Sequence, residues 1–167
     1  MKKIISVPIF LLLNVFFDSI FFVRLNLWGT RPDTVIAIIT AISITSGSLA
    51  GTAYGLAAGL LLDVLFGKYI GLLSLIYMLP AMAAGFFYRR YYADNKLFPC
   101  LIAMALYIVK ELLLIVFLLI TQQQYNYFMV LWRYLLPSAI LTGLITYPIN
   151  VLYKKLQQRQ LYRERYR

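Results

Sequence analysis

The 167-residue chain has no histidine, one cysteine and only six acidic residues. Without histidine, HExxH zinc sites and Ser-His nucleophile pairs are excluded, and a single cysteine excludes an internal disulfide. We interpret Cys100 as a packing residue. The few aspartates lack the surrounding motif of an intramembrane aspartyl protease. The composition therefore predicts a protein that is not an enzyme and that holds no metal and no cofactor.

Hydrophobic residues make up 62% of the chain and the mean hydropathy is +0.79. A membrane-spanning helix needs roughly 20 apolar residues, so most of the chain is used by spans. The sequence predicts an all-α integral membrane protein with a transmembrane domain at 1–153 and a basic tail at 154–167. A basic start precedes the first apolar run, but bulky residues follow it, so we expect an uncleaved span. The five clear spans are Lys3–Val23, Ser48–Phe66, Leu72–Tyr88, Leu97–Ile120 and Val130–Tyr153.

A shorter apolar run, Thr34–Thr45, decides the topology. If Thr34–Phe66 were one helix, the chain would have five spans, whereas a break at Ser46-Gly47-Ser48 gives six spans and two cytoplasmic termini. Basic residues favour cytoplasmic loops, and six spans place eleven of them inside and four outside. The inner set is Lys2, Lys3, Arg89, Arg90, Lys96, Lys154, Lys155, Arg159, Arg163, Arg165 and Arg167; the outer set is Arg24, Arg31, Lys68 and Arg133.

That second span would be short, because 12 to 15 residues reach only about 18 to 22 Å at roughly 1.5 Å each. The sequence allows two alternatives for this span, a complete crossing of the bilayer or a re-entrant segment.

Glycines recur at every fourth position of the third predicted span and of the turn that follows it. A step of four residues rotates a helix by about 400°, so these glycines trace a band along one ridge. In lipid, small residues let helix backbones approach closely. We expect the band to pack within this chain; a partner's helix and, third, a small ligand are the alternatives. The band comprises Gly47, Gly51, Gly55, Gly59, Gly67 and Gly71, with Asp63 in the same register.

The segment GLLLDVLFGKYIG, preceded by Arg31-Pro32-Asp33 before a short span, resembles the MreD family of rod-shape-determining membrane proteins. The resemblance implies six transmembrane helices and a fold similar to the S components of energy-coupling-factor vitamin transporters. It also implies a non-enzymatic scaffold subunit of the cell-elongation machinery, which makes peptidoglycan for the cell wall. The expected location is the bacterial inner membrane. The implied partners are MreC first, then RodA, a class B penicillin-binding transpeptidase and MreB.

The alternative function is that of a substrate-binding S component of such a vitamin transporter. S components commonly carry an alanine-x-x-x-alanine motif on their first span, and Lys3–Val23 contains no alanine. This absence disfavours the alternative.

Charged residues within the predicted spans indicate a polar layer in the outer half of the membrane. Asp18, Asp63 and Lys110 each lie 13 to 15 residues from the cytoplasmic end of an outward-running helix, a depth of roughly 20 to 22 Å. Glu111 adds a third acid, which Arg133 could neutralise. Charges at this depth need partners. We expect Lys110 to pair with the aspartates in a structural network; an ion or proton pathway is the alternative.

The basic tail begins where the last span leaves the membrane. Anionic lipid headgroups attract such a segment by roughly 1 kcal/mol per basic residue near the surface. We expect lipid anchoring and no nucleic-acid partner, with docking of a cytoplasmic protein as the alternative. The residues concerned are Lys154, Lys155, Arg159, Arg163, Arg165 and Arg167.

Overall fold

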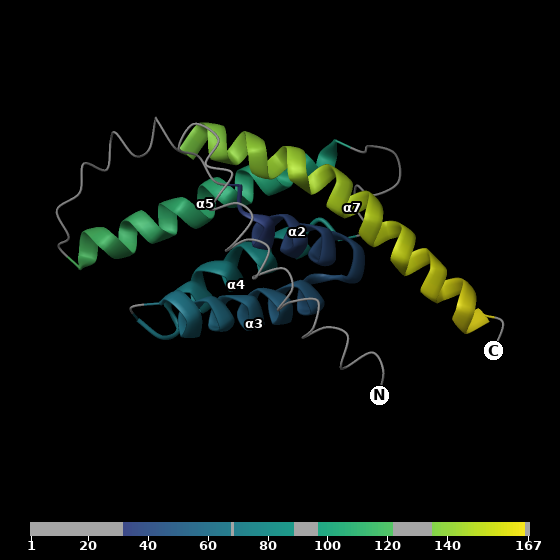
Figure 1. The fold of residues 1–167 in the computed structure, drawn as a ribbon, viewed down its shortest axis with the longest axis horizontal. Coiled ribbons are helices and arrows are strands. Elements are labelled where there is room, and N and C mark those ends of the chain that lie inside the picture. The colour runs from purple at the N-terminus through teal and green to yellow at the C-terminus, as the bar shows by residue number, and fades with distance from the viewer. Residues whose placement is uncertain (1–31, 68, 89–96, 122–134, 166–167) are drawn as a thin grey trace.

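The computed structural model describes residues 32–67, 69–88, 97–121 and 135–165. Within these ranges the chain forms five helices and no strand (Figure 1). Three of them are long and apolar enough to cross a membrane: α3, α5 and the Leu136–Lys155 part of α7. The first predicted span, Lys3–Val23, lies outside the described residues, so the count of six spans stays a prediction. The helices are α2 (Thr34–Ser46), α3 (Ser48–Phe66), α4 (Leu72–Gly85), α5 (Phe98–Ile120) and α7 (Leu136–Arg165).

The break between α2 and α3 lies at Gly47, as the sequence predicted. Gly47 has a φ of 98°, a conformation that glycine adopts readily and other residues rarely adopt. The chain reverses there so sharply that a Cβ on Gly51 would collide with the side chain of Ser43. A single helix from Thr34 to Phe66 is therefore excluded.

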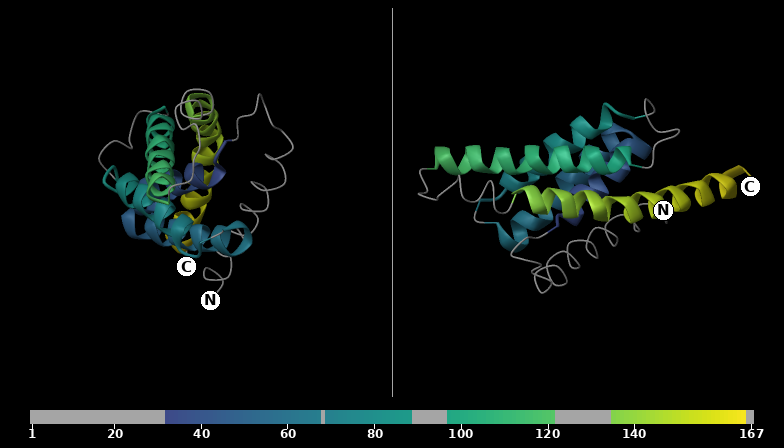
Figure 2. Two further views of the ribbon diagram at one scale, coloured as in Figure 1. Left: turned by 90° about the vertical axis from the view of Figure 1, so that its left-hand side faces the viewer. Right: turned by 90° about the horizontal axis from the view of Figure 1, so that it is seen from above.

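Helix α2 occupies the centre of the bundle. Every residue from Thr34 to Thr45 is buried, and α2 contacts α3, α4, α5 and α7 (Figures 1 and 2). Its 13 residues extend about 20 Å, less than the roughly 30 Å of the hydrocarbon core. A helix this short is tolerated within a membrane because protein, not lipid, surrounds its ends.

Contacts between helix ends define the two ends of the bundle. At one end, which we call the Gly47 end, the rings of Phe87 and Phe98 meet edge to face with their centroids 5.8 Å apart. The hydroxyls of Ser46 and Tyr153 are hydrogen-bonded at 3.1 Å at the same end. At the opposite, Tyr69 end, the ring of Tyr69 lies 5.8 Å from that of Phe117. Helices α3, α4, α5 and α7 therefore alternate in direction, as the predicted topology requires of them.

The last helix continues past Tyr153, where the last predicted membrane span ends. Helix α7 is unbroken from Leu136 to Arg165, a length of about 45 Å. The basic segment therefore continues the last span as helix through Arg165.

Candidate functional site

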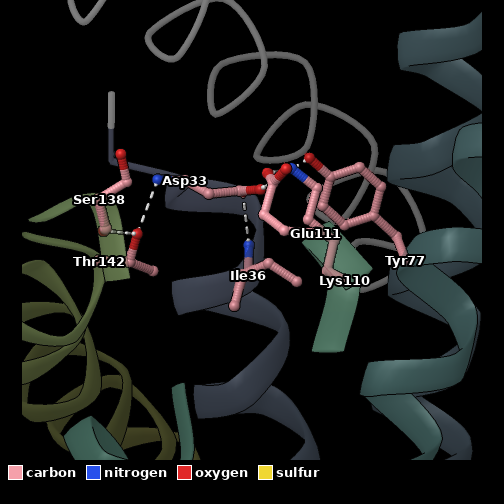
Figure 3. A network of polar contacts seen from close by, with 7 residues as sticks. All are labelled: Asp33, Ile36, Tyr77, Lys110, Glu111, Ser138 and Thr142. Atoms are coloured by element: carbon pink, nitrogen blue, oxygen red, sulfur yellow. Dashed lines mark hydrogen bonds and ion pairs between the residues drawn. The ribbon is translucent and has the colours of Figure 1, made fainter. Parts of the chain in front are cut away.

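A buried polar cluster surrounds the start of α2 (Figure 3). Asp33 directly precedes the helix and caps it, because its Oδ1 accepts a hydrogen bond from the backbone N–H of Ile36 at 3.0 Å. The backbone N–H of Asp33 donates to Oγ1 of Thr142 on α7 at 3.0 Å. The Thr142 hydroxyl in turn donates to the carbonyl of Ser138 at 2.8 Å. Asp33 thus joins the first turn of α2 to α7.

Lys110 of α5 supplies the positive charge of the cluster. Its Nζ lies 3.3 Å from Oδ2 of Asp33 and 2.7 Å from Oε1 of Glu111. The hydroxyl of Tyr77 on α4 donates to Oδ2 of Asp33 at 2.8 Å. The ammonium also lies 5.6 Å from the ring centre of Tyr77 and 5.4 Å from that of Tyr107, within the range of cation–π attraction. The cluster therefore connects α2, α4, α5 and α7.

The charges of this cluster offset one another only as a set. Two carboxylates face one ammonium, and the N-terminus of α2 adds a partial positive charge of roughly half a unit beside Asp33. The side chains of Asp33 and Lys110 are 7% and 11% exposed, whereas that of Glu111 is 23% exposed. At such burial, removing one partner leaves an uncompensated charge that costs more than the intact pair contributes. The arrangement is suited to fixing helices in one register.

Asp63 has a different role from the one that its sequence position suggested. Its carboxylate accepts hydrogen bonds from the backbone N–H groups of Gly71, Leu73 and Ser74 at 2.9, 3.0 and 3.0 Å. These groups belong to the first turn of α4, where N–H donors have no partner within the helix. The expected pairing of Lys110 with Asp63 is wrong, because Lys110 pairs with Asp33 and Glu111.

The glycine band is in contact with α2 and α4. A Cβ on Gly55 would lie 2.9 Å from the carbonyl oxygen of Tyr77, and one on Gly59 would lie 2.7 Å from that of Leu73. Gly51 faces Ser43 of α2, as described above. The backbones of α3 and α4 therefore touch along the band, and side chains at these positions would separate the helices.

The other two glycines of the set shape the turn between α3 and α4. The N–H of Gly67 donates to the carbonyl of Asp63 at 2.8 Å and ends α3. Gly71 has a φ of 98° and precedes the first residue of α4. Both positions help to bring the N–H groups of α4 to the Asp63 carboxylate.

Several predicted residues lie elsewhere or outside the described ranges. Asp18, Arg133 and Arg167 are among the residues that the structure does not describe, so any part they have in the polar layer or the tail stays a prediction. Cys100 is half-buried in α5. The basic residues at 154, 155, 159, 163 and 165 all belong to α7.

Sequence reasoning missed several members of the cluster, among them Asp33, Tyr77 and Thr142. Asp33 had been noted only as part of the Arg-Pro-Asp motif, although an aspartate directly before an apolar helix is a capping signal. The Tyr77 and Thr142 hydroxyls carried no signal, because each lies within an apolar helix. Across the described ranges, no three residues among cysteine, aspartate and glutamate are grouped so that they could hold a metal ion.

Comparison with models of known protein families gives a match over most of the chain. Residues 1–156 match the model of a family described as rod shape-determining protein MreD. No curated protein matches the chain. No solved structure matches it either.

Proposed function

We propose, from the premise that this chain belongs to the MreD family of rod shape-determining membrane proteins, that it is a non-enzymatic scaffold of the cell-elongation machinery. The match over residues 1–156 carries this proposal. The scaffold binds MreC through transmembrane helix packing. RodA, a class B penicillin-binding transpeptidase and MreB are further partners of the same assembly.

The internal contacts support a scaffold role. The charged groups of the polar cluster are bonded to one another, and the Asp63 carboxylate caps α4, so these polar groups fix helix positions. Helices α2 and α4 already pack against the glycine band, so no second helix can approach it. A partner helix must therefore pack on side chains that the bundle leaves exposed.

The outer face of α3 suits such a helix. Ala53, Leu56, Ala57 and Leu60 are exposed there. Two alanines four residues apart let a second backbone approach closely, and close approach supplies much of the attraction between helices in lipid. We infer that this face receives the MreC helix.

The orientation follows from the basic residues. Tyr153 lies at the Gly47 end of the bundle, and Lys155 follows it on α7. The positive-inside rule assigns such an end to the cytoplasm. We therefore infer a multi-pass protein of the inner membrane with both termini cytoplasmic.

Co-purification with MreC in mild detergent tests the proposal. The double variant Ala53→Leu/Ala57→Leu should fold normally and recover about tenfold less MreC, since one displaced helix contact removes roughly 1.4 kcal/mol. Ala105→Leu, the same change at an exposed position of α5, should recover MreC at the wild-type level.

The outcomes separate the two parts of the proposal. Full recovery of MreC by the double variant would show that α3 is not the interface. Wild-type protein that recovers no MreC, and instead a cytoplasmic ATPase pair and a vitamin, would replace the scaffold function with that of an S component.

A further inference from the structure

Within the part of the chain that the structure describes, two buried side-chain atoms have no hydrogen-bond partner. They are the hydroxyl oxygen of Tyr54 on α3 and Oδ1 of Asn150 on α7. Tyr54 is 6% exposed and Asn150 is 3% exposed. Buried polar groups are normally bonded to protein or to ordered water, because an unpaired one is costly in an apolar interior. The two atoms therefore indicate a bound molecule.

Asn150 lies near the Gly47 end of α7. Three residues later on the same helix, the hydroxyl of Tyr153 is hydrogen-bonded to that of Ser46 at the end of α2. Three residues correspond to about 5 Å along a helix, and both helices run toward the Gly47 end. Asn150 therefore lies at about the level of Ser43 in α2.

Tyr54 reaches the same level from α3. Helix α3 runs away from the Gly47 end beside α2, and its Gly51 faces Ser43. Tyr54 follows Gly51 by three residues, but helix side chains lean toward the N-terminus, which brings its hydroxyl back toward the level of Gly51. Tyr54 is also close enough to Tyr153 to interact with it electrostatically. The two unpaired atoms therefore lie at one level of the bundle, with Tyr153 close to both.

We propose that a buried water molecule binds at this level and joins the Tyr54 hydroxyl to the Asn150 amide, so that it links α3 to α7. Water fits because it donates and accepts: Oδ1 of Asn150 needs a donor, and a tyrosine hydroxyl can take either part. The Tyr153 hydroxyl, engaged in one bond with Ser46, can make another. These groups supply the roughly three partners that a buried water usually has.

The burial of the site favours water over a larger ligand. Both unpaired atoms are closed off from the surface of the molecule, so a ligand must be small enough to be enclosed between the helices. The inference goes beyond the proposed scaffold function and does not depend on it, because it concerns how α3 is held against α7.

Thermal denaturation of the full chain in detergent tests the inference by the sign of the effect. Tyr54→Phe removes only the hydroxyl. With water bound, the variant loses a satisfied hydrogen bond, and the midpoint should fall by about 2 to 4 °C. With nothing bound, it loses an unpaired buried group, and the midpoint should rise. Tyr69→Phe, the same change at an exposed ring of the Tyr69 end, should leave the midpoint unchanged.

Water-edited solid-state NMR of the full chain in lipid bilayers detects the water itself. Transfer of magnetisation from water to the Asn150 side-chain amide should be strong, and Asn150→Leu identifies that signal by its loss. In Tyr54→Phe the transfer should fall roughly twofold, because the water keeps fewer partners. The ring of Tyr77, equally buried but with its hydroxyl bonded to Asp33, should receive little magnetisation.

Three outcomes would overturn the inference. A higher midpoint in Tyr54→Phe would show that the site is empty. A lower midpoint without water transfer to Asn150 would show that the hydroxyl is bonded to a protein group instead. A midpoint that depends on Na⁺ or K⁺ at constant ionic strength, and loses this dependence in Asn150→Leu, would assign the site to a cation.

Discussion

The contact between α3 and α4 and the polar cluster at the start of α2 differ in how far apart their residues lie in the sequence. The first joins Gly55 and Gly59 to residues 73–81, which follow within one hairpin. The second joins Asp33 to Thr142, 109 positions away. The hairpin is held by close backbone contact and the cluster by a few directed polar bonds. Local packing thus builds the hairpin, and long-range polar bonds fix it relative to α5 and α7.

The largest expected effect comes from Lys110→Leu. This change leaves the buried Asp33 carboxylate without its ion-pair partner, at a cost of about 3 to 5 kcal/mol. The fraction of folded, detergent-soluble protein, measured by fluorescence-detected size-exclusion chromatography, should fall steeply. The double variant Lys110→Leu/Asp33→Asn should recover part of that yield, because the uncompensated charge is gone.

The matched control for this pairing is Lys110→Leu/Asp63→Asn. Asp63 bonds to backbone N–H groups of α4, so its neutralisation should give no rescue. Rescue by Asp63→Asn and none by Asp33→Asn would contradict the pairing that the structure shows.

The same comparison explains what the sequence could reveal. The glycine band could be predicted because helix packing imposes a spacing of four residues on the chain. The break at Gly47 could be predicted because only six spans place most of the basic residues in cytoplasmic loops. The pairing of Lys110 with Asp33 could not be predicted in this way. It depends on how α2 and α5, which are distant in sequence, pack against each other. The similar depths of Asp63 and Lys110 along their helices suggested that they pair. In the structure the Asp63 carboxylate instead accepts hydrogen bonds from backbone N–H groups at the start of α4.

The second effect, on the hairpin, comes from Gly59→Leu. A side chain here meets the backbone of Leu73 and Ser74, which cannot move aside as a flexible side chain would. We expect a loss of about 3 kcal/mol, and a smaller loss for Gly59→Ala. Thermal denaturation in detergent measures both. Ala105→Leu, an exposed substitution of the same size class, should leave the midpoint unchanged, and a midpoint for Gly59→Leu equal to that control would refute the close contact.

The third effect concerns the cap of α4. Asp63→Ala removes the acceptor for three backbone N–H groups, at a cost of about 2 kcal/mol. Hydrogen exchange should accelerate at Gly71, Leu73 and Ser74 while the amide of Ile36, capped by Asp33, stays protected. Equal acceleration at both helix starts would mean that the two caps are coupled, and the comparison between hairpin and cluster would lose its basis.

The smallest effect separates the two contacts that Tyr77 makes. Tyr77→Phe removes the hydroxyl that donates to Asp33 but keeps the ring beside the Lys110 ammonium. The loss should be about 1 kcal/mol, the usual contribution of one hydrogen bond, and should vanish in an Asp33→Ala background, which has no side-chain acceptor for the hydroxyl. Tyr77→Leu should cost more, because the aromatic face is lost as well. The lysine remains paired with both carboxylates in Tyr77→Phe, so the folded yield should stay close to that of the unmodified protein while the thermal midpoint falls by a few degrees. If Tyr77→Phe and Tyr77→Leu lowered the midpoint equally, the ring would contribute nothing to holding Lys110, and the ion pairs alone would account for the cluster.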